Sequence, residues 1–115
     1  MKEVFTMKLN KFDHQEQTTE NSRYECTDYT LGHYLVSHYI ATYTDGDVRE
    51  RFVISGHSRY LPEIFFEDGC FGEEKRFEIQ TRAYGTMTVD KIKEVVAGYQ
   101  RAIEAVEILT KEFIK

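Results

Sequence analysis

Four histidines are the residues of this chain best suited to bind a metal or transfer a proton: His14, His33, His38 and His57. Imidazole titrates near neutral pH and is the commonest side-chain ligand of transition metals. His33 and His38 form an H-x4-H pair. In a strand, side chains alternate between the two faces, so an offset of five residues places this pair on opposite sides. The sequence also has no Cys–His zinc pattern. We therefore expect no metal site and no bound cofactor.

Carboxylates are densest in the run that leads from Glu67 and Asp68 to Glu73 and Glu74. Paired carboxylates carry out acid–base chemistry when burial separates their pKa values. This run flanks a glycine-rich loop, and we expect its side chains to be solvated. Cys70 lies in the same loop, but a reactive thiolate needs a helix N-terminus or a close cation. We predict no catalytic residue and a non-enzymatic protein, with a small enzyme using histidine and carboxylate residues as an alternative.

Aromatic and basic side chains interleave along the middle of the chain. Arg49 and Arg51 are two residues apart and should share one strand face, and Arg82 and Tyr84 should share another. A sheet face that carries stacking aromatics and cations is how proteins hold single-stranded nucleic acid. These four residues are therefore the candidate nucleic-acid face. In the alternative interpretation the tyrosines pack at the edge of the core and the arginines pair with glutamates. The other tyrosines on or beside expected strands are Tyr24, Tyr29, Tyr34, Tyr39, Tyr43 and Tyr60.

The sequence predicts a long helix over residues 89–114, against which the elements that carry these side chains must pack. Its apolar residues recur at steps of three and four, which places them on one helical face. Thr88 is a suitable N-cap, and Asp90 in the first turn complements the helix dipole. Gly98 lies in mid-helix, either because the backbone of a strand or of a second helix approaches it closely or because a surface glycine is tolerated there. The apolar positions are Ile92, Val95, Val96, Tyr99, Ala102, Ile103, Val106, Leu109 and Phe113.

The region before this helix has the patterns of strands. Alternating or β-branched stretches predict strands over residues 4–12, 23–30, 33–44, 48–55, 59–67 and 75–84. Residues 13–22 contain no apolar side chain, and we expect a long loop there. Asp45 and Gly46 predict a two-residue hairpin turn of type I′. In the last strand, Phe77, Ile79, Thr81 and Ala83 should point inward.

One domain over residues 1–115 is the default for a chain of this length. The fold class that we predict is α+β, with an antiparallel meander sheet of five to six strands over residues 4–84 and the helix packed on one face. With 41% hydrophobic and 30% charged residues, the composition is that of a globular protein. We find no repeat and no linker.

The formal net charge of −5 arises before residue 88, because residues 88–115 carry five basic and five acidic residues. A net negative charge argues against non-specific binding to nucleic acid. Cys26 and Cys70 form no CxxC motif, so we expect free thiols in a cytoplasmic protein. No apolar run is long enough to span a membrane, and the first residues lack the apolar core of a signal peptide. The expected location is the cytoplasm, without a membrane partner.

Several antiparallel strands followed by a C-terminal helix, with Gly85, Thr86, Met87 and Thr88 leading into that helix, resemble the layout of the positive-cofactor-four type of transcriptional coactivators. The resemblance covers the order of the elements and the junction between strand and helix. It implies a homodimer that pairs through its helices and holds single strands on a curved sheet. No residue of that family is carried over to this sequence.

The function that we predict is association, with the protein acting as a homodimeric interaction module. The helix should be longer than the sheet is wide, and its last turns remain apolar. Such a patch is most simply covered by a second copy across a two-fold axis. The candidate dimer face is Ile108, Leu109, Phe113 and Ile114. A single-stranded nucleic-acid-binding protein, of the kind found in mobile elements, is the alternative.

Overall fold

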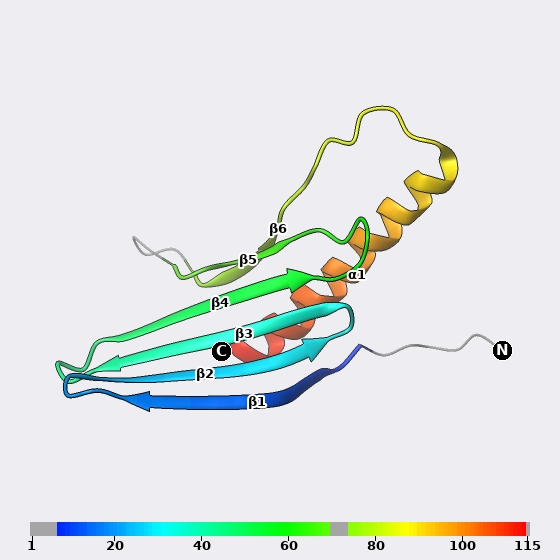
Figure 1. Ribbon diagram of the computed structural model, residues 1–115. Helices are drawn as coiled ribbons and strands as arrows, with labels where there is room; N and C mark the ends of the chain where they lie inside the picture. The colour runs from blue at the N-terminus through cyan, green and yellow to red at the C-terminus, as the bar shows by residue number, and fades with distance from the viewer. Residues whose placement is uncertain (1–6, 70–73, 115) are drawn as a thin grey trace.

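The computed structural model describes residues 7–69 and 74–114 of the chain. Four long strands, β1 (Leu9–Thr18), β2 (Ser22–Leu31), β3 (Tyr34–Tyr43) and β4 (Val48–Gly56), form one antiparallel sheet in chain order (Figure 1). Two short strands, β5 (Ile64–Glu67) and β6 (Arg76–Ile79), form a separate antiparallel pair, and helix α1 (Val89–Phe113) follows. The expected α+β class is confirmed. The strands are divided between two sheets, however, and do not form a single meander.

The strands predicted over residues 23–30, 33–44 and 48–55 are confirmed as β2, β3 and β4, with bounds that differ by at most one residue. The alternation of side chains that predicts a strand is clearest in β3. There Tyr34, Val36 and His38 are buried, and the residues between them are more exposed. Phe52 and Ile54 of β4 lie opposite His38 and Val36 in the register, so their side chains share the same face. We call this buried side of the four-stranded sheet the inner face.

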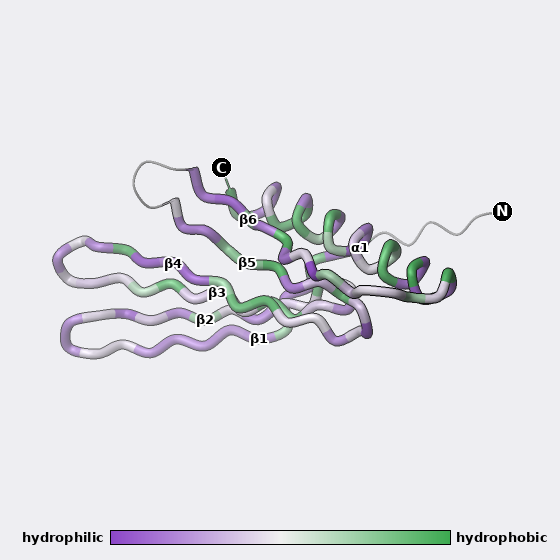
Figure 2. Tube along the Cα trace, turned by 90° about the horizontal axis from the view of Figure 1, so that it is seen from above, coloured by the Kyte–Doolittle hydropathy of each residue, from purple (hydrophilic) through white to green (hydrophobic). Residues whose placement is uncertain are grey.

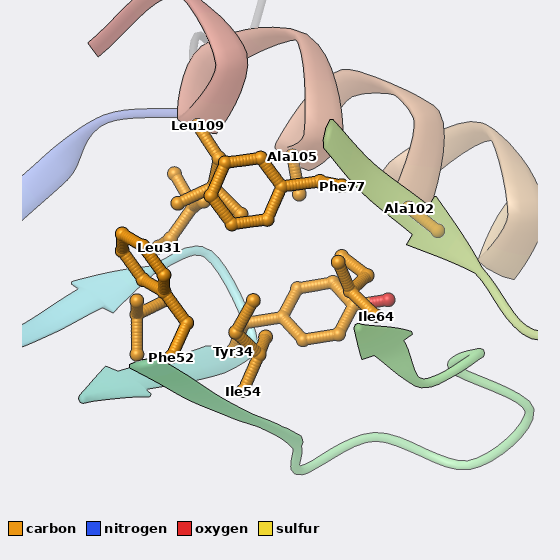
Figure 3. Close-up of a cluster of buried hydrophobic side chains, with 10 residues drawn as sticks. Leu31, Tyr34, Phe52, Ile54, Ile64, Phe77, Ala102, Ala105 and Leu109 are labelled. Atoms are coloured by element: carbon orange, nitrogen blue, oxygen red, sulfur yellow. The ribbon is translucent and has the colours of Figure 1, made fainter. Parts of the chain in front are cut away.

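The hydrophobic core lies between the inner face, the β5–β6 pair and α1 (Figure 3). Aromatic and aliphatic side chains from β2, β3 and β4 converge on small residues of the helix, which let the layers approach closely. Tyr34 is buried in this core, and its hydroxyl donates a hydrogen bond of 2.6 Å to the carbonyl oxygen of Pro62. The buried core residues are Leu31, Tyr34, Val36, Phe52, Ile54, Ile64, Phe77, Ala102, Ala105 and Leu109.

Helix α1 begins and ends where its capping residues predict. The Thr88 side chain accepts a hydrogen bond from the backbone N–H of Lys91, which satisfies one of the free donors of the first turn. Asp90 follows in that turn, and Lys111 lies in the last turn, so both charges complement the helix dipole. The N-cap and the extent predicted for this helix are therefore confirmed.

Gly98 is buried at the point where α1 meets the segment between β4 and β5. A Cβ atom at this position would lie only 2.2 Å from the backbone carbonyl oxygen of Tyr60. Tyr60 itself has a φ of +61°, a left-handed conformation that few side-chain-bearing residues adopt. Of the two explanations for a glycine here, close approach of another backbone is confirmed, but the neighbour is the turn that carries Tyr60 and not a strand or a second helix.

The hairpins β1–β2 and β3–β4 extend well past the C-terminal end of α1 (Figure 1). We call these projecting parts, residues 13–27 and 39–51, the hairpin arms. Their tips are mostly polar, whereas apolar segments gather where β3, β4 and β5 approach the helix (Figure 2). Residues 13–22 were expected to form a loop, and this is wrong, because β1 continues to Thr18 and a short turn leads into β2. Water reaches both faces of this arm, so its strands need no apolar alternation.

The turn at Asp45 and Gly46 does join β3 to β4, but not as a two-residue type I′ turn. The N–H of Gly46 donates to the carbonyl of Tyr43, and the N–H of Tyr43 donates to the carbonyl of Asp47. Gly46 has a φ of +89°, and Asp45 is not among the residues with positive φ. This is the three-residue loop in which a glycine follows an ordinary turn and adopts the left-handed conformation.

The two strands expected over residues 59–67 and 75–84 are much shorter than predicted. Pairing starts only at Ile64 in β5 and stops at Ile79 in β6. Phe77 is buried and Ile79 half-buried, as expected, whereas Thr81 and Ala83 are exposed, and their predicted inward direction is wrong. After Ile79 the chain leaves its partner strand to reach the start of α1, so no ladder keeps side chains alternating (Figure 1). Cys70, and Val4 and Phe5 of the first predicted strand, lie outside the described residues.

Candidate functional site

The side of the four-stranded sheet that faces away from α1 forms an open surface, which we call the outer face. Residues between the buried positions of β3 point there, among them Tyr39 and Tyr43. The register places Arg51 opposite Tyr39, and both Tyr24 and Arg49 opposite Ala41, so these side chains share that face. In the described part of the chain α1, β5 and β6 all lie on the other side (Figures 1 and 2).

Aromatic and cationic side chains on the outer face contact one another. The Arg51 guanidinium lies 4.7 Å from the centre of the Tyr39 ring, and the Arg49 guanidinium lies 5.9 Å from that of Tyr43. Tyr24 meets Tyr43 edge-on at 6.3 Å. Arg49 also bonds to Asp47 at 3.2 Å, so part of its charge is neutralised. The structure thus brings Arg49 and Arg51 together with tyrosines, as the sequence pattern indicates.

Arg82 and Tyr84 do not join that surface. Both follow β6, where the chain runs toward the start of α1. Arg82 forms an ion pair of 3.5 Å with Glu63, and its backbone N–H donates to the Tyr99 hydroxyl at 3.0 Å. Tyr84 meets Tyr60 edge-on at 5.8 Å. The four residues of the candidate nucleic-acid face therefore form two separate pairs.

The four residues of the candidate dimer face at the C-terminal end of α1 pack against the protein's own core. Leu109 is fully buried, and Ile108, Phe113 and Ile114 are partly buried against the core cluster. The Phe113 ring contacts His38 and Phe52, with both centre-to-centre distances at 4.9 Å. The expectation that these side chains remain in water is not met, because the last turns of α1 lie over the inner face of the sheet.

Exposed apolar residues instead run from the first turn of α1 to just past its middle, and the start of this helix extends beyond the sheet (Figure 1). Val89 is 68% exposed, Ile92 is 48% exposed, and Val96 and Ile103 are each 50% exposed. At about 100° per residue these four positions fall within roughly 60° of one another around the helix axis. We call them the helix ridge. By the same measure they lie roughly 140° around the axis from the buried line of Gly98, Ala102, Ala105 and Leu109, so the ridge faces away from the side of the helix that is buried.

His38 and Glu50 form a pair at the edge of the core. The His38 Nε2 and Glu50 Oε2 atoms are 2.7 Å apart, and Lys75 Nζ lies 3.5 Å from the other carboxylate oxygen. The His38 ring stacks on Phe52 with a centre distance of 4.2 Å. Glu50 and Lys75 also line an open groove of about 820 Å³ beside the β5–β6 pair. A histidine beside a carboxylate is suited to proton transfer, but this ring is buried within an aromatic cluster.

A second histidine–carboxylate group lies on the inner face of the β1–β2 arm, beyond the cover of α1. His14 Nδ1 is 2.7 Å from the Thr27 hydroxyl, and His14 Nε2 is 3.1 Å from Glu16 Oε1. Arg23 Nη2 lies 2.7 Å from Glu16 and 3.4 Å from Glu25. The hydrogen bond from His14 and the adjacent Arg23 guanidinium hold the pKa of the Glu16 carboxyl below its usual value. We call these five residues the arm cluster.

The arm cluster has little signal in the sequence, because residues 13–22 have the composition of a loop. The one usable signal is an H-x-E spacing, which places both side chains on one face of a strand. The helix ridge could not be predicted from the sequence for another reason. The helix has nine apolar positions, which is more than a single sheet face covers, and the sequence pattern does not indicate which of them remain exposed.

Cys26 is free and partly buried on the outer face. Burial, together with the nearby Asp28 carboxylate, raises the pKa of its thiol above the usual value. A raised pKa lowers the thiolate fraction at neutral pH, which does not suit a nucleophile.

Among the described residues, α1 lacks the apolar length needed to cross a membrane. Comparison of the chain with protein-family models, with curated proteins and with solved structures gives no match.

Proposed function

We propose that the protein is a non-enzymatic interaction module that pairs with a second copy of itself through the helix ridge. The observation that carries this proposal is the line of four large apolar side chains, each about half exposed or more, along α1, whose N-terminal part extends past the sheet. Monomeric proteins usually limit such continuous apolar surface. A two-fold axis through the ridge lets one surface serve both partners.

The geometry of the ridge suits helix–helix packing. Its residues span about 21 Å along the axis at about 1.5 Å per residue. Two antiparallel copies centred near Val96 would place the Val89 end of one helix beside the Ile103 end of the other.

The expected affinity follows from the exposed apolar surface. Full burial of a Val or Ile side chain stabilises by roughly 1.5–3 kcal/mol, and about half of that remains available here. Four residues on each of two copies then contribute roughly 6–12 kcal/mol, against about 4–15 kcal/mol for association. The most favourable difference, about 8 kcal/mol, corresponds to a micromolar dissociation constant, so we expect a dimer no tighter than micromolar.

Sedimentation equilibrium from about 5 to 500 μM tests this proposal, because that range brackets micromolar affinity. We expect the mass to rise from monomer to dimer, and Val96→Glu to keep the protein monomeric throughout. Val48→Glu is the matched control, since Val48 is 59% exposed on a hairpin arm far from the ridge. A monomer mass at every concentration, or a dissociation constant that Val96→Glu leaves unchanged, would refute the proposal.

Single-stranded nucleic acid is a second candidate partner, favoured by the arginine–tyrosine contacts of the outer face. Bases stack on aromatic rings with little sequence preference, and arginines neutralise phosphates beside them. Three tyrosines and two arginines gather on this face without a covering layer among the described elements. The overall charge of −5 opposes such binding, so it should be weak and strongly dependent on salt.

Fluorescence anisotropy with a labelled oligothymidine at about 20 mM salt, where the electrostatic contribution is large, tests this second candidate. We expect the double substitution Arg49→Ala and Arg51→Ala to weaken binding and to reduce the slope of log K against log salt by about 1.4. The control is Arg59→Ala with Arg101→Ala, which removes the same charge from elsewhere on the surface. Equal losses in both double variants, or no binding at low salt, would exclude the outer face as the site.

A further inference from the structure

The arm cluster contains an arrangement that strand pairing normally disfavours. Glu16 of β1 and Glu25 of β2 are direct register partners, so two carboxylates stand side by side on the inner face of the arm. Like charges at directly opposed positions destabilise a sheet. Arg23 offsets this repulsion, because its guanidinium lies within 3.4 Å of both glutamates. A positive charge is therefore favoured between the carboxylates of Glu16 and Glu25.

His14 completes a set of three possible ligands at that place. One imidazole nitrogen and one carboxylate oxygen from each of Glu16 and Glu25 all lie within 4.8 Å of one another. Neighbouring ligands of a tetrahedral zinc ion are about 3.4 Å apart when each bond is about 2.1 Å long. The side chains are partly exposed, so small rotations about their own bonds close this difference without moving the strands.

Thr27 gives the histidine the orientation that a metal ligand needs. The His14 Nδ1 atom lies 2.7 Å from the Thr27 hydroxyl, which accepts a hydrogen bond when Nδ1 carries the proton. In the metal-free cluster Nε2 carries a proton that it donates to Glu16; binding of a metal would replace that proton, and the tautomer with the proton on Nδ1 would direct the Nε2 lone pair at the ion beside Glu16. Hydrogen bonds of this kind from the second ring nitrogen fix the tautomer and the ring orientation of metal-bound histidines.

We propose that His14, Glu16 and Glu25 bind a divalent transition metal ion of the zinc class, and that the Arg23 guanidinium occupies the same place when no metal is bound. One nitrogen and two oxygen ligands suit zinc with water in the remaining position. Ligands of this kind also bind copper more tightly than nickel. Metal and arginine compete for the same two carboxylates, so the affinity is set by how readily Arg23 moves aside.

Isothermal titration of the full-length protein with zinc chloride tests this site. We expect one ion per chain, binding at least about tenfold weaker in His14→Ala, Glu16→Gln and Glu25→Gln, since each removes a direct ligand. Arg23→Gln should bind zinc about tenfold tighter, because a positive charge near the ion is removed. His57→Ala is the control, as His57 is exposed on a turn away from the cluster. Circular dichroism of each variant checks that it remains folded.

The Arg23→Gln variant separates this site from casual binding to surface histidines. Any exposed imidazole binds zinc weakly, and such binding would weaken in His57→Ala as much as in His14→Ala and would not respond to Arg23. Equal losses in the two histidine variants, no change in Arg23→Gln, or no heat of binding at millimolar zinc would each overturn the proposal. Tighter binding in Arg23→Gln together with weaker binding in Glu25→Gln would support it.

Discussion

Replacing Gly98 by alanine should destabilise the protein, although alanine is the better helix former. A Cβ atom at this position meets the Tyr60 carbonyl oxygen at 2.2 Å and its carbonyl carbon at 3.1 Å. Relief of that overlap requires the helix and the segment carrying Tyr60 to separate by about 1 Å, since carbon and oxygen normally stay more than about 3 Å apart. Both partners are backbone atoms, so no side-chain rotation removes the clash.

Two opposing contributions set the size of the effect. Alanine in place of glycine favours an exposed helix by about 1 kcal/mol. Overpacking a tight interface costs typically about 1–3 kcal/mol, and sometimes more. Tyr60 has little freedom to move, because it already adopts a left-handed φ. It also lies two residues before Pro62, whose carbonyl oxygen accepts a hydrogen bond from the buried Tyr34 hydroxyl. We expect the clash to win, with a net loss of about 1–2 kcal/mol.

Urea unfolding followed by circular dichroism measures this loss. The matched control is Gln100→Gly, which places a glycine on an exposed part of the same helix and should cost about 1 kcal/mol through helix propensity alone. If Gly98→Ala is instead more stable than the native sequence, Tyr60 does not approach the helix tightly, and the clash proposed for this position does not exist.

Three further perturbations test the fold. Gly46→Val should cost about 1–2 kcal/mol, because Gly46 has a φ of +89° with open space around its Cβ position, so the loss measured in urea reports backbone strain only. Leu109→Ala should cost about 2–5 kcal/mol as a cavity in the core, and a loss below about 1 kcal/mol would contradict the burial of that side chain. Burial raises the pKa of Tyr34 to about 12. The neutral hydroxyl therefore contributes stability that is complete below pH 10, the ordinary pKa, and is lost as the pH rises toward 12. Tyr34→Phe should remove this alkaline loss, and its unfolding free energy at about pH 8 should fall by about 1 kcal/mol with the hydrogen bond to Pro62.

The parts of the fold that could be predicted are those in which local pattern and tertiary contact agree. Tyr34, Val36 and His38 alternate because one face of β3 is buried, and that alternation is visible in the sequence. Thr88 marks the start of α1 because its hydroxyl oxygen accepts a hydrogen bond from the backbone N–H of Lys91, a donor in the first turn that has no partner within the helix. Both signals depend on a few neighbouring residues, so sequence patterns are sufficient to find them.

The parts that could not be predicted depend on partners distant in the chain. Residues 13–18 pair with β2 by backbone hydrogen bonds, which require no apolar side chains where water reaches both faces. The left-handed Tyr60 follows from its position against Gly98 and has no local signal. For the candidate sites, the shared face of Arg49 and Arg51 followed from their spacing of two. The separation of that pair from Arg82 and the meeting of Glu16 with Glu25 depend on strand pairing, which spacing does not reveal.

The hairpin arms divide the sheet into two regions of different local stability. Near α1 the strands are held by the core, so their amide protons should exchange with solvent only through global unfolding. In the arms the same ladders have water on both faces, and opening them exposes little apolar surface. Amides of the arms should therefore exchange faster, with protection that falls from the helix-covered end toward the turns at residues 19–21 and 44–47. A ligand that binds to either arm would slow this exchange locally, so hydrogen exchange can locate the binding site of a partner whose chemical identity is still unknown.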